Sequence, residues 1–350
     1  MSAQPVLLNL SQTQLQDLMR AWGQPTYRAE QIATWLDQNF AADALEMTNL
    51  PQALRRRLAE ETILSPLTPL TVQESTDGQT CKTLFALPDN RQIEAVLMRY
   101  NKRRTLCIST QVGCAMDCPF CATGQMGFMR NLTAAEIVAQ VFYYARQLHN
   151  IGESVTNIVF MGMGEPLANY TETWRAIRRL NNPTGFNLGA RRMTLSTVGL
   201  VPAIRQMSKE PEQVGLAISL HAPTDDLRNT IVPLNRRYPL AMLMQTVRDY
   251  IAQTGRRVTF EYALMDRLND GPEQAAQLVD LLQGLLAHVN LIPLNPTPGS
   301  PWSGSPDERV IAFRDRLEAG GLNCTIRLRR GIDIAAGCGQ LHNAFNQAGG

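Results

Sequence analysis

Three cysteines lie within a stretch of eight residues, at Cys114, Cys118 and Cys121, with the spacing C-x3-C-x2-C. A structural zinc site usually takes four ligands, commonly from two separated pairs, and no histidine stands near these cysteines in the sequence. Three thiolates instead suit three corners of an iron–sulfur cube, whose fourth iron then has an open position for a small molecule. The spacing therefore favours an iron–sulfur cluster. A zinc knuckle or three unrelated buried thiols are the alternatives.

Two further cysteines, Cys107 and Cys338, have sequence neighbours that favour a reactive thiol. Cys107 lies in a strand-like stretch in which alternation puts it on the same face as Thr105 and Ser109, a polar face that could look into a barrel. Cys338 lies between two glycines, which allow a thiol to swing and a bulky substrate to approach closely. Taken alone, Cys107 equally fits a small buried hydrophobic residue.

The composition is that of a globular protein of 350 residues with a hydrophobic fraction of 44%. No apolar run approaches the roughly 18 residues of a membrane helix, and residues 1–14 lack the basic-then-apolar order of a secretory signal. We therefore expect a cytoplasmic protein with no membrane partner, and a monomer. Seven cysteines in a long chain do not resemble a secreted disulfide framework, so they are better explained as metal ligands or catalytic groups.

The charge balance is nearly neutral, with 33 Lys and Arg against 31 Asp and Glu, for a net charge of +2. Basic residues nevertheless recur in short clusters, namely Arg55 to Arg57, Lys102 to Arg104, Arg178 and Arg179, Arg191 and Arg192, Arg236 and Arg237, Arg256 and Arg257, and Arg327 to Arg330. If several of these clusters meet on one face, they form a surface that contacts phosphates. A solvated surface with no ligand is the alternative.

The elements that must position these cysteines fall into three predicted parts. Residues 1–64 read as a helical N-terminal domain, in which Asn9 or Ser11 caps the first helix. Residues 65–101 read as a β-hairpin extension with strands at 83–87 and 93–99, where Glu94 would be an ordinary solvent-facing acid. Residues 102–345 read as an α/β domain that includes the loop of Cys338.

The third part alternates strand-like and helix-like stretches. The predicted strands are 105–110, 156–161, 192–197, 215–221, 257–265 and 289–294, and helices follow each of them, among them 133–149, 171–180 and 307–319. Six such units predict a parallel sheet with right-handed crossovers, curled into a partial (β/α)6 barrel. Functional groups of such barrels gather at the carboxyl ends of the strands.

Polar or glycine-rich motifs follow most of these strands. The cysteine loop follows the first, and the others end in Gly162 to Pro166, Ser196, Ser219 to His221, and Asn295. Each has an ordinary explanation by itself, because a glycine-rich strand end is commonly a tight turn, a serine can cap a helix and a single histidine can be structural. Their shared position favours one site.

These residues carry a resemblance to known families. C-x3-C-x2-C with an aromatic residue before the last cysteine resembles the radical S-adenosylmethionine (SAM) superfamily. From the N-terminal helices to Gln340 the chain resembles the RlmN family of RNA methyltransferases. The matching segments are Glu94, TLCISTQVGC, MGMGEPL, LSTVGLVPA, AISLHAP, NLIPLNP and CGQL.

The resemblance implies a role for each matching residue. Cys114, Cys118 and Cys121 would hold a 4Fe-4S cluster, whose open iron takes the amino and carboxylate groups of SAM. Cys338 would carry the methyl group, Cys107 would resolve the intermediate and Glu94 would accept a proton. Contacts to SAM would come from Gly164, Glu165, Ser196, Ser219, Leu220, His221 and Asn295.

The implied reaction is methylation of carbon 2 of an adenosine in the peptidyl-transferase region of 23S ribosomal RNA, and of the adenosine next to the anticodon in some transfer RNAs. Carbon 2 of adenine offers no nucleophile, so a radical route is needed. It uses two SAM molecules per turnover, an electron donor such as a flavodoxin or ferredoxin, and a transient disulfide between Cys338 and Cys107. The base must enter unstacked.

The chain also departs from the family pattern. The familiar sequence before the thiol is acid-Ala-Ala-Cys, whereas this chain reads Ala335-Ala336-Gly337-Cys338 and lacks the acid. Any part that this acid plays in orienting the loop is therefore in doubt. Two other functions compete: methylation of carbon 8 of the same adenosine, and a non-enzymatic iron–sulfur or zinc module that binds RNA.

Overall fold

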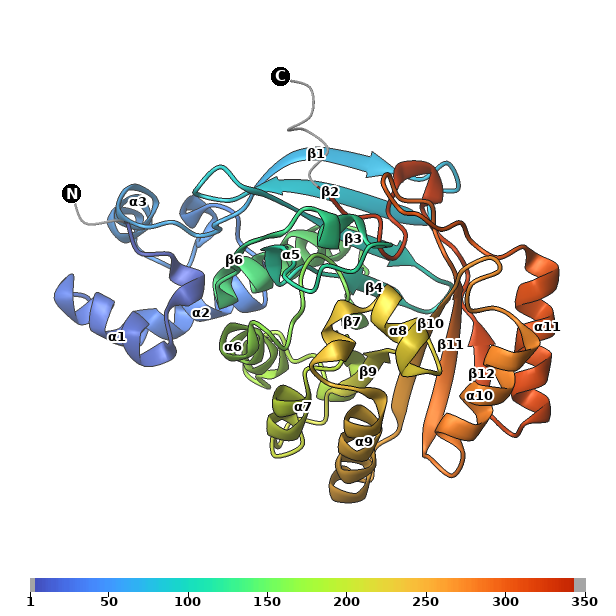
Figure 1. The fold of residues 1–350 in the computed structure, drawn as a ribbon. Helices are drawn as coiled ribbons and strands as arrows, with labels where there is room; N and C mark the ends of the chain where they lie inside the picture. The colour runs from blue at the N-terminus through green and yellow to red at the C-terminus, as the bar shows by residue number, and fades with distance from the viewer. Residues whose placement is uncertain (1–3, 343–350) are drawn as a thin grey trace.

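A computed structural model describes residues 4–342. Its main feature is a ten-stranded sheet with the order β1-β2-β3-β4-β7-β8-β9-β10-β11-β12 (Figure 1). Strands β4 and β7 to β12 run parallel to one another and curl around a common interior. This arrangement confirms the predicted partial α/β barrel.

The described part of the chain has seven parallel strands, one more than the six predicted. They are β4 (Arg104–Cys107), β7 (Asn157–Phe160), β8 (Met193–Thr197), β9 (Gly215–Ser219), β10 (Val258–Leu264), β11 (Ala287–Pro293) and β12 (Cys324–Ile326). Six of them match the predicted set, and β12 was missed because three residues are too few to show a periodic pattern. It pairs with β11 through Val289 and Cys324 and extends the parallel sheet.

Helices cover the outside of the parallel strands. They are α5 (Ala134–His149), α6 (Tyr170–Asn181), α7 (Val201–Met207), α8 (Asp225–Ile231), α9 (Leu240–Thr254), α10 (Pro272–Leu282) and α11 (Asp307–Ala319), with short 3-10 turns η3 (Ala190–Arg192) and η4 (Pro233–Arg236). Helix α5 starts at a capping box in which the Thr133 hydroxyl accepts a hydrogen bond from the Glu136 amide. Its almost complete burial makes it the central support of the sheet.

Three antiparallel strands continue the sheet beyond β4. They are β1 (Thr68–Glu74), β2 (Thr80–Ala86) and β3 (Gln92–Arg99), and β3 pairs antiparallel with β4. The predicted hairpin corresponds to β2 and β3. Strand β1 was missed because nearly all of its side chains are exposed, so its sequence lacks alternation. The extension is thus part of the same sheet as the barrel.

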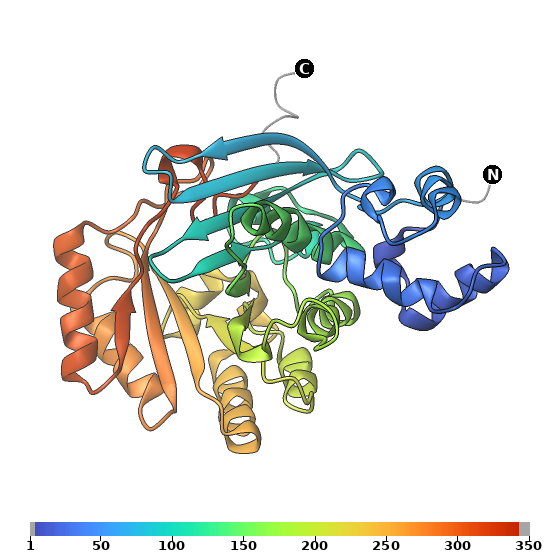
Figure 2. The same ribbon diagram turned by 180° about the vertical axis from the view of Figure 1, so that it is seen from behind.

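The N-terminal helices pack against α5 and α6 (Figure 2). They are α1 (Gln12–Ala21), α2 (Arg28–Asp37) and α3 (Gln52–Glu61), with 3-10 turns η1 (Leu7–Asn9) and η2 (Ala44–Glu46). Ser11 caps α1, as one of the two predicted possibilities. Asn9 instead accepts a hydrogen bond from the Ala135 amide at the start of α5, at 3.3 Å. The ion pair of Arg179 with Asp37, at 2.7 Å, adds a second link.

The remaining short elements lie around the loop of Cys114, Cys118 and Cys121 or precede the loop of Cys338. Strands β5 (Gln111–Gly113) and β6 (Phe128–Asn131) form a two-stranded sheet around α4 (Ala122–Gln125), and η5 (Ile332–Ile334) precedes Cys338. No helix within residues 4–342 has the length and apolar character needed to cross a bilayer.

Candidate active site

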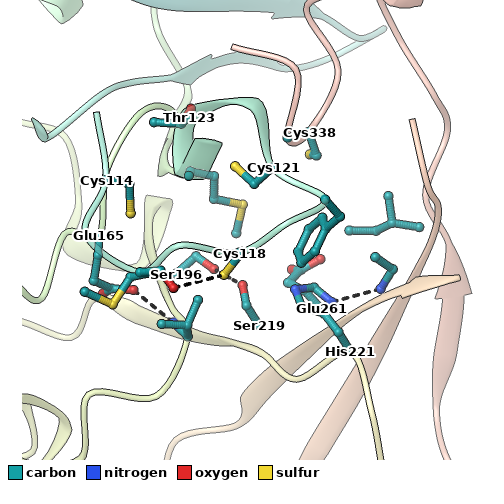
Figure 3. Close-up of a pocket in the computed structure, with 18 of the residues that line it drawn as sticks. Cys114, Cys118, Cys121, Thr123, Glu165, Ser196, Ser219, His221, Glu261 and Cys338 are labelled. Carbon is teal, nitrogen blue, oxygen red and sulfur yellow. Dashed lines mark hydrogen bonds between the residues drawn. The ribbon is translucent and has the colours of Figure 1, made fainter. Parts of the chain in front are cut away.

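A cavity lies at the carboxyl ends of the parallel strands (Figure 3). It brings together most of the residues singled out from the sequence, namely Cys114, Cys118, Cys121, Gly164, Glu165, Ser196, Ser219, His221, Asn295 and Cys338. These residues come from six separate segments of the chain. Their convergence explains why most of the strand ends carry a polar or glycine-rich motif.

The loop of three cysteines is wound so tightly that glycine is required at its start. Gly113 has a φ of +73°, and a Cβ atom there would lie 1.8 Å from the carbonyl oxygen of Gly127. The next residue, Cys114, donates its amide hydrogen to that same oxygen at 2.9 Å. Further along, the Cys121 amide donates to the Cys118 carbonyl at 3.1 Å. The backbone thus closes on itself and turns the three thiols inward.

Burial dominates the chemistry of the three thiols. It raises the pKa of Cys114 to about 12, and it raises the pKa of Cys118 and Cys121 as well. Thiols in such a place become thiolates only when a metal cation replaces the proton. Within residues 4–342 no three His, Cys, Asp or Glu side chains converge on a single metal ion. An iron–sulfur cube does not need such convergence, because each thiolate binds a different iron.

Two buried polar atoms in the cavity have no hydrogen-bond partner among the described residues. One is Oδ1 of Asn295, whose Nδ2 donates to the Cys338 carbonyl at 3.1 Å. The other is Oε2 of Glu261, which is 3.6 Å from the Arg327 guanidinium and too distant for a good hydrogen bond. Unpaired buried acceptors are costly, so they indicate a polar ligand with donor groups.

Glu165 braces the ends of two strands. Its carboxylate accepts hydrogen bonds from the amides of Leu167 at 3.0 Å and Val198 at 2.9 Å. Burial raises the pKa of Glu165 to about 7, although these hydrogen bonds oppose the shift. Gly164 has a φ of +101°, and a Cβ atom there would lie 2.5 Å from the Gln111 side chain. The motif therefore needs glycine for close packing against the cysteine loop.

Ser196, Ser219 and His221 form one wall of the cavity (Figure 3). The two serine hydroxyls are 3.2 Å apart. His221 accepts a hydrogen bond from the Ala263 amide through Nδ1 at 3.0 Å, and burial lowers its pKa to about 3, so the ring is neutral and carries its hydrogen on Nε2. Leu220 differs from its predicted neighbours, because its side chain is fully buried in the hydrophobic core and does not line the cavity.

Arg228 holds this wall in place and was not identified from the sequence. Its guanidinium is 1% exposed and donates to the carbonyl oxygens of Val198, Ser219 and Leu220 and to Oδ1 of Asn235. It therefore joins the ends of β8 and β9 from behind. Nothing in the sequence distinguishes this arginine from the many surface arginines.

Cys338 lies where this cavity meets a second one. The second cavity is lined by Cys107, Cys338 and Arg327, among others. Burial and the neighbouring Cys338 raise the pKa of Cys107 to about 12, while Arg327 opposes the shift. The two thiols in turn raise the pKa of Arg327, with Cys338 as the largest cause. The structure thus brings the two predicted thiols together beside one cation.

The Cys338 loop is held by its neighbours on the cysteine loop. The Ala122 amide donates to the Gly339 carbonyl at 2.8 Å, and the Thr123 hydroxyl donates to the Leu341 carbonyl at 2.7 Å. The Gln340 side chain donates to the Pro296 carbonyl, also at 2.8 Å. These contacts fix both loops to each other and to the end of β11, so the thiol faces the cavity without the missing acid.

The sequence predicts that Glu94 faces solvent, but the structure buries it. It is 3% exposed and forms an ion pair with Lys82, with 2.9 Å between Nζ and Oε1. Its other oxygen accepts a hydrogen bond from the His342 amide at 2.9 Å. Glu94 lines a different pocket and not the cavities that contain Cys107 and Cys338. The structure therefore does not place it with the other predicted catalytic residues.

Comparisons with known proteins agree with this geometry. Residues 108–279 match the family model "Radical SAM superfamily", and residues 6–64 match "Ribosomal RNA large subunit methyltransferase N-terminal domain". A protein of Roseiflexus castenholzii named "Probable dual-specificity RNA methyltransferase RlmN" is 48% identical, with 96% of each chain covered. One of the same name from Chloroflexus aurantiacus is 50% identical, with 97% of this chain and 93% of the relative covered.

The chain belongs to the RlmN family. A solved structure supports this assignment at the level of the fold: the crystal structure of a radical SAM methyltransferase from Sphaerobacter thermophilus is 52% identical, covers 97% of this chain and 99% of its own, and has a TM-score of 0.94. As an RlmN-family protein, this chain is a SAM-dependent methyltransferase with the radical SAM fold.

The residues present fit the cofactors of a radical SAM enzyme. Three thiols that line one cavity, with no fourth protein thiolate in the same loop, suit a 4Fe-4S cluster with one open iron. The unpaired oxygens of Asn295 and Glu261 suit the amino and ribose donors of SAM. The cavity is mostly apolar with a few polar groups, which is typical of a cofactor site.

Proposed function

We propose that this protein methylates carbon 2 of an adenosine in the peptidyl-transferase region of 23S ribosomal RNA and the adenosine next to the anticodon in some transfer RNAs. The observation that carries the proposal is the position of Cys338, which lines both the cavity of the three cluster thiols and the cavity of Cys107. A thiol in this position can take up a group in one compartment and release it in the other.

The proposed chemistry depends on the two thiols. The 4Fe-4S cluster and SAM, when bound, supply the methyl group and the radical chemistry that carbon 2 of adenine requires, with two SAM molecules used per turnover. The Cys338 sulfur accepts the methyl group as a thioether. After loss of one hydrogen atom, the carbon on Cys338 bonds to carbon 2 of the adenine. The ring proton then leaves this protein–RNA adduct to a base, and one electron leaves it, for which the oxidised cluster would be the acceptor.

Cys107 completes the reaction. Its sulfur attacks the Cys338 sulfur, the bond between sulfur and carbon breaks, and the carbon keeps the electron pair and takes up a proton to become the methyl group. The two cysteines are left as a disulfide that an external reductant must open. Arg327 supports this step because its positive charge favours a thiolate at Cys107, whose pKa is raised by burial.

Glu94 is the proposed acceptor of the ring proton, on the basis of the resemblance alone. Because Glu94 is paired with Lys82 and lines a separate pocket, the C-terminal loop must rearrange before the carboxylate reaches a base. Lys82 also donates to the Ala335 carbonyl at 3.3 Å, so movement of this loop would free both partners. The proposal further includes a flavodoxin or ferredoxin as electron donor, a cytoplasmic location and a monomeric state.

The test is an anaerobic incubation of the cluster-loaded protein with SAM, reductant and either 23S ribosomal RNA fragments or transfer RNA. Mass spectrometry of the nucleosides should find 2-methyladenosine. Finding 8-methyladenosine would replace the proposed position by carbon 8. If no methylated RNA and no 5′-deoxyadenosine form, the non-enzymatic RNA-binding module becomes the better explanation.

A further inference from the structure

The cavity that contains Cys107 opens separately from the cavity of the cluster thiols. The two share a partition made of Met161, Ile292, Asn295, Arg327 and Cys338. On the side of Cys107, the lining continues to Tyr100 and to residues 328–330, which are partly or fully exposed. The second cavity therefore leads from the thiol pair to the protein surface without passing the cofactor site.

The Tyr100 ring, which contacts the guanidinium groups of two arginines, forms the outer part of this second cavity. The guanidinium carbons of Arg330 and Arg103 lie 4.5 Å and 5.1 Å from the centre of the Tyr100 ring. Leu328, next to them, is 72% exposed, which is the largest exposure recorded for a bulky apolar residue within 4–342. A fixed aromatic ring and an exposed apolar side chain suit stacking against nucleobases.

Positive charge surrounds the same opening. Within residues 4–342, Lys102, Arg103 and Arg330 form no ion pair, and Nε of Arg330 is buried without a hydrogen-bond partner. Arg329 has only a 3.8 Å contact with the largely exposed Asp307. Arginines that are not neutralised by carboxylates remain available for phosphates.

The arginine run of the N-terminal helices differs in this respect. Arg57 forms an ion pair with Glu61 at 2.9 Å, and Arg55 donates to the Leu45 carbonyl at 2.9 Å. Two of its three members are thus engaged within the N-terminal unit itself. The opening at Cys107 is the better candidate for phosphate contacts near the reacting base.

We propose that the second cavity takes the target adenine and that its rim, defined as Tyr100, Arg103, Leu328, Arg329 and Arg330, holds the single-stranded RNA on either side of that base. This inference rests on the proposed function, because it assumes that the substrate is RNA. The unstacked base passes inward to Cys338, the neighbouring bases stack on Tyr100 and Leu328, and the arginines bind the flanking phosphates. SAM and RNA therefore approach Cys338 from opposite sides.

The test compares Arg103→Glu, Arg329→Glu and the double variant with the wild type. Arg248→Glu serves as the matched control, because Arg248 is an exposed arginine on α9. Two measurements are made on the cluster-loaded full-length protein. One is methyl uptake on Cys338 from SAM without RNA, read by peptide mass spectrometry. The other is the KM for the RNA substrate at several salt concentrations.

We expect methyl uptake within twofold of wild type in all variants, a KM for RNA raised about tenfold or more in the double variant, and a salt dependence whose slope falls by about 1 for each lost phosphate contact. Arg248→Glu should match the wild type. An unchanged KM and slope in the double variant would overturn the rim assignment, with RNA then held elsewhere on the protein.

The proposed function and this inference can fail separately. A wild-type protein that never places a methyl group on Cys338 refutes the proposed function. Normal methyl uptake with undisturbed RNA kinetics in the variants refutes only the rim. Should charge reversal also reduce methyl uptake, Arg103→Gln and Arg329→Gln repeat the comparison without adding negative charge, and Tyr100→Leu tests the stacking surface with no change in charge.

Discussion

Lys82 and Glu94 form a buried ion pair that ties the loop before Cys338 to the antiparallel strands. Lys82 also donates to the Ala335 carbonyl, and Glu94 accepts from the His342 amide, so the pair contacts the C-terminal segment on both sides of the thiol. Neither strand contributes to the cavity of the cluster thiols. The extension at the sheet edge therefore serves to hold the loop that carries the reactive sulfur.

Lys82→Met should lower the free energy of unfolding by about 3 to 5 kcal/mol, because it leaves the Glu94 carboxylate buried and unpaired. Chemical denaturation measures this change.

Glu94→Gln keeps the side-chain shape and distinguishes two roles of Glu94, anchoring of the loop and acceptance of the ring proton. A residue that only anchors the loop predicts slower methyl uptake on Cys338. A proton acceptor predicts normal uptake followed by accumulation of the protein–RNA adduct.

Cys107→Ala should trap the protein covalently joined to RNA through Cys338, because the sulfur that breaks the bond is missing. A denaturing gel with labelled RNA shows the crosslink, and proteolysis with mass spectrometry locates it. Cys324→Ala is the matched control, since Cys324 is a buried cysteine outside both cavities. Free turnover by Cys107→Ala would be incompatible with the resolving role.

Gly113→Ala should abolish cluster assembly, whereas Gly127→Ala should not. Both glycines have a positive φ, at +73° and +70°, so both substitutions cost about 1 to 2 kcal/mol of backbone strain. Only at Gly113 would the new Cβ also overlap a backbone oxygen, at 1.8 Å, while at Gly127 it meets nothing within 4 Å. Iron and sulfide content after reconstitution gives the readout. Equal loss in both variants would contradict the steric argument.

The contribution of His221 to the stability of the cofactor-free protein should fall as the pH drops below about 6.5, while Glu165, whose pKa burial raises to about 7, contributes in the opposite direction. His221 has a pKa of about 3 in the folded protein because of burial, against about 6.5 when unfolded. The unfolded chain therefore binds more protons in this range, and His221 contributes a loss of up to about 1.4 kcal/mol per pH unit. His221→Asn suits the positive φ of +61° at this position and should remove this contribution, so the difference in stability between the wild type and the variant should change with pH below about 6.5. A profile unchanged by the substitution would assign the pH dependence to other groups.

The repeating elements were predictable because they depend on local pattern. Helix α11 begins and ends at the predicted residues, Asp307 and Ala319, and the six predicted parallel strands all exist. Strand order then follows from right-handed crossovers, so the convergence of the strand-end motifs also followed from the sequence.

Other features depend on contacts between distant segments, which no local pattern contains. The sequence predicts Asn9 as a candidate cap for α1, but its side chain reaches the start of α5. Glu94 alternates as an exposed strand residue would, and only the return of the C-terminal loop covers it. Arg228 is recognisable as a positioning residue only when three strand-end carbonyls surround it.

Asn295 donates to the Cys338 backbone from the far end of β11, while the antiparallel strands hold Ala335 three residues earlier. The main chain of this loop is thus clamped at both ends, and the freedom that remains belongs to the sulfur itself. The one-carbon unit can then pass from donor to acceptor by rotation of the Cys338 side chain, and only the later removal of the ring proton by Glu94 requires the loop to move.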